Sequence, residues 1–138
     1  MSKEFHTAPI LVVEDSVEVR RSLEWLLSVE GYTVVTAING ADALRKLHAG
    51  LRPCIILLDL QMPEMDGFEF RRLQLQDPQV ESIPIIIYAD MVDPQTVAKQ
   101  LKAAAYVQKP FDLDALLAVV AAHCDKPVVP RPKLKRAS

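Results

Sequence analysis

Three acidic side chains and one lysine follow apolar runs at widely separated points of the chain. Glu14 and Asp15 follow the run that begins at Ile10, Asp59 follows a second run, and Lys109 follows a third. A single carboxylate at such a position is often a helix cap. Carboxylates repeated at the ends of buried strands instead indicate a ligand site, because the carboxyl ends of parallel strands meet at one edge of a sheet. We expect these four side chains to share one pocket.

The charges of this pocket restrict its chemistry. Glu14, Asp15 and Asp59 would repel one another without a counter-charge. Lys109 supplies one positive charge, and a divalent cation would supply two. Ligands that are all oxygen atoms favour Mg²⁺ over zinc or copper, and Mg²⁺ keeps several waters, which leaves room for a phosphoryl oxygen. Asp59 is then a candidate nucleophile toward phosphorus, and the product would be an acyl phosphate.

The elements that position these residues alternate along the chain. Five apolar runs with little polar alternation are typical of parallel strands buried on both faces. They are Ile10–Val13, Thr33–Thr36, Cys54–Leu58, Ile85–Ile87 and Tyr106–Val107. Helical patterns lie between Ser16 and Gly31, from Ala43 to Gly50, and over Phe68–Leu75, Pro94–Ala104 and Asp112–His123. This order predicts an α/β fold with a five-stranded parallel sheet, doubly wound, and helices on both faces.

The length and charge of the chain set its general class. Its 138 residues fit one compact domain, which we expect over residues 8–124, followed by a basic, proline-rich tail over 125–138 that is extended or disordered. The net charge of -2 gives no general attraction to nucleic acid or to an anionic membrane. No apolar run approaches the roughly 18 residues of a membrane span. We therefore expect no membrane partner and a cytoplasmic location.

The two cysteines match no metal-binding or redox spacing. Cys54 and Cys124 lie far apart in the sequence. Cys54 opens an apolar run, so we expect it to be a small buried hydrophobic residue. The chain is then interpreted as reduced and intracellular.

Three segments resemble the signature segments of response-regulator receiver domains. They are Ile10–Ser16 (ILVVEDS), Leu57–Gly67 (LLDLQMPEMDG) and Tyr106–Phe111 (YVQKPF). The resemblance covers roughly residues 8–124 and implies a flavodoxin-like sheet with strand order 2-1-3-4-5. It also implies a cis peptide bond before Pro110.

The resemblance implies a role for each residue of the acidic pocket. Asp59 would accept a phosphoryl group from a phosphohistidine on a sensor histidine kinase or phosphotransfer protein. Asp15 would coordinate Mg²⁺, with Glu14 acting mostly through water, and Asp59 and the backbone carbonyl of Gln61 would complete the metal ligands. Lys109 would pair with Asp59 and then with the phosphoryl oxygens.

The switch region departs from the pattern of this family. Members normally carry Thr or Ser at the end of the fourth strand, and counting from Pro84 places Ala89 there, which has no hydroxyl. Phosphorylation should then shift this domain less than its relatives. Asp90 replaces a small residue and either repels a phosphoryl group or points outward. Tyr106 occupies the aromatic position that rotates inward on activation. Lys102 replaces the usual Gly, so the fourth helix is expected to be short or irregular.

Other functions remain open at this point. The main prediction is a phosphorylated signalling module rather than an enzyme, and the alternative is a receiver that acts as a phosphorylation-independent protein-binding scaffold. An aspartate-dependent phosphatase would need a second acid where Gln61 stands, and a flavin site would not begin with Glu14 and Asp15. The expected output is contact with an unknown effector protein, without direct nucleic-acid binding, and the sequence leaves a homodimer open.

Overall fold

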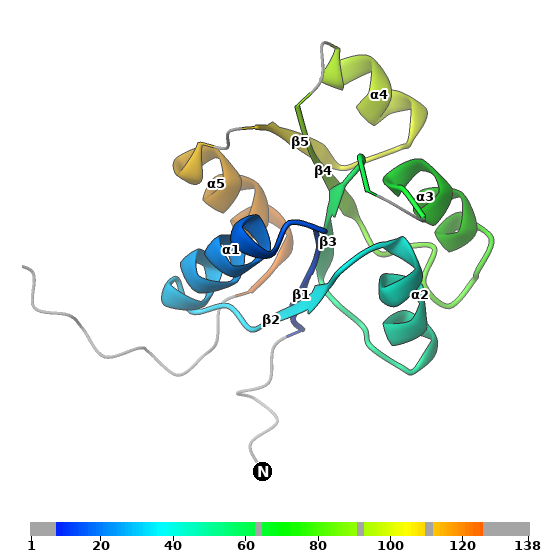
Figure 1. The fold of residues 1–138 in the computed structure, drawn as a ribbon, viewed down its shortest axis with the longest axis horizontal. Helices are drawn as coiled ribbons and strands as arrows, with labels where there is room; N and C mark the ends of the chain where they lie inside the picture. The colour runs from blue at the N-terminus through cyan, green and yellow to red at the C-terminus, as the bar shows by residue number, and fades with distance from the viewer. Residues whose placement is uncertain (1–7, 63–64, 91–92, 110–111, 126–138) are drawn as a thin grey trace, which may run out of the picture.

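The structure, a computed structural model, describes residues 8–62, 65–90, 93–109 and 112–125 (Figure 1). Five parallel strands form one sheet in the order β2-β1-β3-β4-β5. The strands are β1 (Ile10–Val13), β2 (Val34–Ala37), β3 (Ile55–Asp59), β4 (Ile85–Ala89) and β5 (Ala105–Gln108). The helices are α1 (Val17–Val29), α2 (Gly40–His48), α3 (Gly67–Leu75), α4 (Pro94–Gln100) and α5 (Leu113–His123). The predicted doubly wound α/β sheet, with strand order 2-1-3-4-5, is confirmed. All of the predicted tail except Asp125 lies outside the described residues.

Helices cover both faces of the sheet. α1 and α5 lie on one face, and α2, α3 and α4 lie on the other (Figure 1). Successive side chains of a strand point to opposite faces, so alternate residues enter two separate apolar clusters. Leu11 packs with Leu47 of α2 in one cluster. Ile10 packs with Leu23 of α1 and Leu116 of α5 in the other. Burial on both faces explains why the strand sequences lack polar alternation.

The helices begin after polar residues that cap them. In each helix the capping side chain accepts a hydrogen bond from a backbone N–H of the first turn, which stabilises a helix start by about 1 kcal/mol. The caps are Ser16, Asn39, Asp66, Asp93 and Asp112. Within the described part of the chain, no helix combines the length and apolar character that crossing a membrane requires.

The fourth helix is shorter than its apolar pattern predicts. α4 ends at Gln100 instead of Ala104, and Leu101 is its C-cap. Lys102 then takes a positive φ of 55°, a left-handed conformation that glycine adopts without strain. The expectation of a short fourth helix is therefore confirmed, and the predicted boundary at Ala104 is wrong because the backbone reverses at Lys102.

A buried polar network holds this reversal. Arg71 of α3 donates from Nε to the carbonyl oxygen of Leu101 and from a terminal nitrogen to that of Lys102, both at 2.8 Å. Arg71 also donates to Gln74 Oε1 at 2.8 Å, and Gln74 Nε2 donates to the carbonyl of Val80 at 3.0 Å. Arg71 and Gln74 are 5% and 0% exposed, so these bonds connect α3 to the end of α4 inside the protein.

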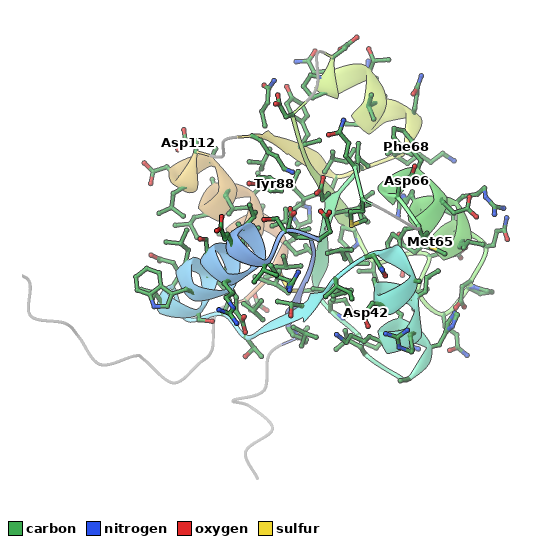
Figure 2. All side chains as sticks on the ribbon, in the orientation of Figure 1. Asp42, Met65, Asp66, Phe68, Tyr88 and Asp112 are labelled. Carbon is green, nitrogen blue, oxygen red and sulfur yellow. A yellow bond between two sulfur atoms is a disulfide. The ribbon has the colours of Figure 1, made fainter. Side chains whose placement is uncertain are left out.

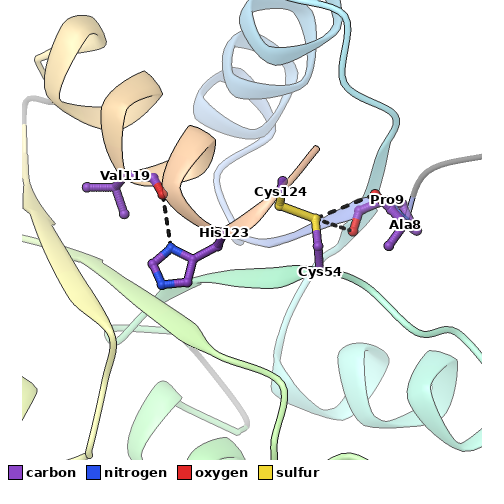
Figure 3. The surroundings of a disulfide bond; sticks show 6 residues. All are labelled: Ala8, Pro9, Cys54, Val119, His123 and Cys124. Carbon is purple, nitrogen blue, oxygen red and sulfur yellow. Dashed lines mark hydrogen bonds between the residues drawn. A yellow bond between two sulfur atoms is a disulfide. The ribbon is translucent and has the colours of Figure 1, made fainter. Parts of the chain in front are cut away.

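The predictions that Cys54 is simply a small buried hydrophobic residue and that the chain is reduced are both wrong, because Cys54 and Cys124 form a disulfide across 70 residues of sequence (Figure 3). Cys54 precedes β3, and Cys124 is the C-cap of α5. Both positions lie at the amino-terminal edge of the sheet, where the sulfur of Cys54 is 3.5 Å from the carbonyl oxygen of Pro9. Sequence spacing gave no signal for this pair, since the fold alone brings the two cysteines together.

Candidate metal-binding site

The predicted acidic pocket forms at the carboxyl edge of the sheet. Glu14 directly follows β1, Asp59 is the last residue of β3, and Lys109 directly follows β5. Because alternate residues share a face, all three side chains continue the rows that face α1 and α5. Asp15 is the next residue after Glu14 and is exposed at the rim. The structure thus brings together the four side chains on which the sequence prediction depends.

Lys109 lies between two buried carboxylates. Its Nζ atom is 3.3 Å from Asp59 Oδ2 and 3.8 Å from Glu14 Oε1. Both carboxylate side chains are 2% exposed, whereas the lysine side chain is 26% exposed. Asp59 Oδ1 accepts a hydrogen bond from the backbone N–H of Gln61 at 3.1 Å. One oxygen of Asp59 is therefore held by the following loop, and the other faces the ammonium group.

The three carboxylates lie close enough together to hold one cation. Glu14, Asp15 and Asp59 each place one oxygen within 4.8 Å of the others. Glu14 Oε2 accepts from the backbone N–H of Ser16 at 3.0 Å, but the buried Oε1 accepts no hydrogen bond from any described residue. A buried carboxylate oxygen without a donor is costly unless a cation or water satisfies it. This all-oxygen set fits Mg²⁺.

Burial also changes the protonation of the pocket. The pKa of Glu14 is raised to about 7, chiefly by burial, and the charges of Asp59 and Asp15 also act to raise it. The N–H of Ser16 and the charge of Lys109 act in the opposite direction. In the metal-free pocket a proton therefore binds Glu14 as the pH falls through about 7, and a bound cation would compete with that proton.

Tyr88 is a residue of this pocket that the sequence prediction missed. It pairs with Asp59 in the register of β3 and β4, and it faces the α1 and α5 side of the sheet (Figure 2). The Nζ atom of Lys109 lies 4.9 Å from the centroid of its ring. Burial raises the pKa of Tyr88 to about 12, and the charges of Glu14 and Asp59 contribute. Alternation along β4 was the available signal, because it places Tyr88 on the opposite face from Ala89.

The predicted switch residues lie on the other face of the sheet. Ala89 is the last residue of β4 and is 2% exposed within the cluster that includes Ala98 of α4. Tyr106 of β5 is half-buried, and its hydroxyl accepts a hydrogen bond from Gln95 of α4 at 3.2 Å. Asp90 is exposed, which favours its interpretation as an outward loop carboxylate. Pro110, with its predicted cis peptide, lies outside the described residues.

Comparisons with known proteins agree with the fold and identify the family. Residues 10–121 match the response regulator receiver domain family. The chain is 34% identical over 116 residues to Protein PilG of Pseudomonas aeruginosa, with 83% of this chain and 85% of that protein covered. It is 40% identical over 111 residues to Response regulator MprA of Mycobacterium ulcerans, with 79% of this chain but 47% of that protein covered. A solved structure of chemotaxis protein CheY4 of Vibrio cholerae is similar at a TM-score of 0.77 and 31% identity, covering 86% of this chain and 99% of that one.

Proposed function

Because this chain belongs to the response regulator receiver domain family, we propose that Asp59 accepts a phosphoryl group from a phosphohistidine. The donor is a sensor histidine kinase or a phosphotransfer protein, the partners with which receiver domains interact. The observation that carries the proposal is the convergence of Asp59, Lys109 and two further carboxylates at one edge of the sheet. The protein acts as a substrate that assists its own modification, without turnover of its own.

The transfer exchanges one bond to phosphorus for another. A carboxylate oxygen of Asp59 forms a bond with phosphorus, while the bond from phosphorus to the imidazole nitrogen breaks and leaves its electron pair on nitrogen. The imidazole leaves as a neutral ring, because its other ring nitrogen carries a proton or the released nitrogen takes one up. The product is an aspartyl phosphate, and its negative charge must be balanced where it forms.

The residues around Asp59 provide that balance. Asp15, Asp59 and the backbone carbonyl of Gln61 would hold Mg²⁺, and Glu14 would act mainly through a bound water. The cation supplies positive charge for the phosphoryl oxygens and for the crowded carboxylates. Lys109 moves its ammonium group from the Asp59 carboxylate, now 3.3 Å away, to an oxygen of the phosphoryl group.

The switch in this chain is weaker than in receivers that carry a hydroxyl at the end of β4. Ala89 cannot donate a hydrogen bond to the phosphoryl group, and losing one charge-assisted hydrogen bond removes about 1.5–3 kcal/mol of preference for the active state. Tyr106 is the remaining element of the switch, since its hydroxyl already contacts Gln95 of α4. The output of the domain is contact with an effector protein in the cytoplasm.

Phosphoryl uptake by the intact protein tests the proposal. The protein is incubated with Mg²⁺ and acetyl phosphate, a small phosphoryl donor, and its mass is measured. We expect the mass of one phosphoryl group to be added, and we expect no addition with Asp59→Asn. Asp90→Asn is the matched control, because Asp90 is an exposed carboxylate that lies outside the acidic cluster.

A protein that takes up no phosphoryl group would contradict the proposal. Failure of the wild-type protein to take up a phosphoryl group, together with failure to bind beryllofluoride, a phosphoryl mimic, would overturn the proposal. The phosphorylation-independent scaffold would then be the better description. Uptake that persists in Asp59→Asn would move the modification to another residue.

A further inference from the structure

Tyr88 lies between Asp59 and Lys109 in the sheet. β4 separates β3 from β5 in the strand order, so Lys109 has to cross the width of β4 to approach Asp59. Neighbouring strands are about 4.8 Å apart, which makes the crossing roughly 10 Å between strand axes. On the face that carries Asp59 and Lys109, the residue of β4 beside Asp59 is Tyr88. The path of the lysine is therefore over the ring of Tyr88.

The contact has the geometry of a cation–π interaction. The ammonium nitrogen lies 4.9 Å from the ring centroid, within the roughly 6 Å range of this attraction. Tyr88 is 4% exposed, so its ring is held by the sheet and by the cluster around α1 and α5. A fixed ring beneath a flexible four-carbon side chain reduces the number of positions that the ammonium group can adopt.

We propose that Tyr88 is a positioning residue that holds the Lys109 ammonium group over its ring, between Asp59 and Glu14, ready for the incoming phosphoryl group. The inference rests on the proposed function of Asp59. The contact between Tyr88 and Lys109 is made on the face of β4 that is covered by α1 and α5. Ala89, on the opposite face of β4, has no hydroxyl to assist. The placement of Lys109 therefore carries more of the stabilisation of the phosphoryl group here.

An ordinary core aromatic residue would fill the same space without directing the lysine. The two roles differ in a spectroscopic signature, because an aromatic ring shifts the resonances of atoms above its face upfield. We expect the Lys109 side-chain methylene protons nearest the ammonium to be shifted upfield in the wild-type protein and in Tyr88→Phe. The shift should disappear in Tyr88→Leu.

Binding of the phosphoryl mimic provides the functional readout. We expect Tyr88→Leu to bind beryllofluoride with Mg²⁺ about threefold to tenfold more weakly than the wild-type protein, and Tyr88→Phe to bind nearly as well. Tyr32→Leu is the matched control, since Tyr32 is a buried tyrosine of the same apolar cluster outside the pocket. It should lower the melting temperature without changing mimic affinity or the Lys109 resonances.

Substitution of Tyr88 by a series of fluorinated phenylalanines tests the contact while the aromatic ring still fills its place in the core. Fluorine withdraws charge from the ring face and alters its shape little, so mimic affinity should fall stepwise as fluorines are added. An affinity that does not change along the series, or Lys109 resonances that are the same in Tyr88→Leu and wild type, would overturn the proposal. If wild type binds no mimic, the function proposed for Asp59 fails, while the resonances still decide whether Tyr88 holds Lys109.

Discussion

Gly67 packs directly against the backbone that carries Asp59. A Cβ atom at Gly67 would lie 2.8 Å from the Cα of Leu60 and 2.9 Å from the carbonyl oxygen of Asp59. The backbone N–H of Gly67 also donates to the carbonyl of Leu60 at 3.2 Å. The start of α3 can therefore approach the end of β3 only when residue 67 has no side chain.

We predict that Gly67→Ala displaces the Asp59–Leu60 backbone. The variant should lose about 1–3 kcal/mol of unfolding free energy through overpacking, and it should take up phosphoryl groups more slowly than wild type. Thermal unfolding and the mass assay measure the two effects. Gly50→Ala is the control, because Gly50 has a φ of +112° and open space around it. That change should cost stability by backbone strain but leave uptake intact, whereas equal uptake in both variants would contradict the prediction.

A hydroxyl at position 89 should strengthen the switch. Ala89→Thr places a donor at the end of β4, and the gain of one charge-assisted hydrogen bond should shift the active-state equilibrium by roughly tenfold or more. We expect larger chemical-shift changes in α4 and Tyr106 when the variant binds beryllofluoride. Ala89→Val controls for size, because valine has nearly the shape of threonine but no hydroxyl. An unchanged response in Ala89→Thr would show that the hydroxyl argument does not apply to this chain.

The sheet and the acidic pocket were predictable because each depends on a local pattern that the topology then combines. Apolar runs identify buried parallel strands, and the residue after each run must lie at the shared carboxyl edge. Glu14, Asp59 and Lys109 could be placed in this way without any knowledge of contacts between them. The end of α4 was harder to predict, because the helical pattern continues past Gln100 and only the positive φ of Lys102 stops it.

Two contacts could be found only once the three-dimensional arrangement was known. The disulfide joins Cys54 and Cys124 from elements that meet only at the far edge of the folded sheet. The role of Tyr88 depends on the strand order, since β4 must lie between β3 and β5 before its side chain can lie under Lys109. The spacing of the two cysteines gave no signal for their bond, and alternation along β4 indicated only the face of Tyr88, not its contact with Lys109.

The affinity for Mg²⁺ should increase with pH. The metal-free pKa of Glu14 is raised to about 7, chiefly by burial, so a proton competes with the cation below that pH. We expect affinity to rise up to about tenfold between pH 6 and 8, measured by calorimetry, as the Glu14 carboxyl loses its proton. Glu14→Gln should bind more weakly and with a smaller pH dependence. A wild-type affinity that is constant across this range would contradict the assignment of the proton to Glu14.

The same raised pKa predicts how the metal-free protein responds to pH. A carboxyl whose pKa is higher in the folded state binds its proton more tightly when folded. The Glu14 contribution to stability is therefore fully present below its ordinary value of 4.5 and is lost as the pH rises through about 7. Added Mg²⁺ should restore stability at the higher pH, and Glu14→Gln should remove this part of the pH dependence. Melting temperatures with and without the cation measure both effects.

Reduction of the disulfide should destabilise the protein without disabling the pocket. Cleaving a bond that closes 70 residues returns conformational freedom to the unfolded chain, which costs about 2–4 kcal/mol. We expect dithiothreitol to lower the melting temperature, and the double variant Cys54→Ala with Cys124→Ala to melt at the lower value with or without reductant. Phosphoryl uptake well below that temperature should be unchanged, since the bond lies at the opposite edge of the sheet from Asp59. A reductant effect on the double variant would point to another cause.

Arg71 should contribute more to stability than its neighbour Arg72 does. The Arg71 guanidinium is buried and donates to the carbonyl oxygens of Leu101 and Lys102, so Arg71→Met would leave acceptors unpaired at the end of α4. We expect a loss of about 1–3 kcal/mol in chemical denaturation, because the Oε1 atom of the fully buried Gln74 also loses the donor that Arg71 provides. Arg72 lies beside it on α3 but is exposed and pairs with Glu69 at the surface, so Arg72→Met should cost much less stability than Arg71→Met. Equal losses in the two variants would mean that the buried bonds of Arg71 do not hold the turn after α4.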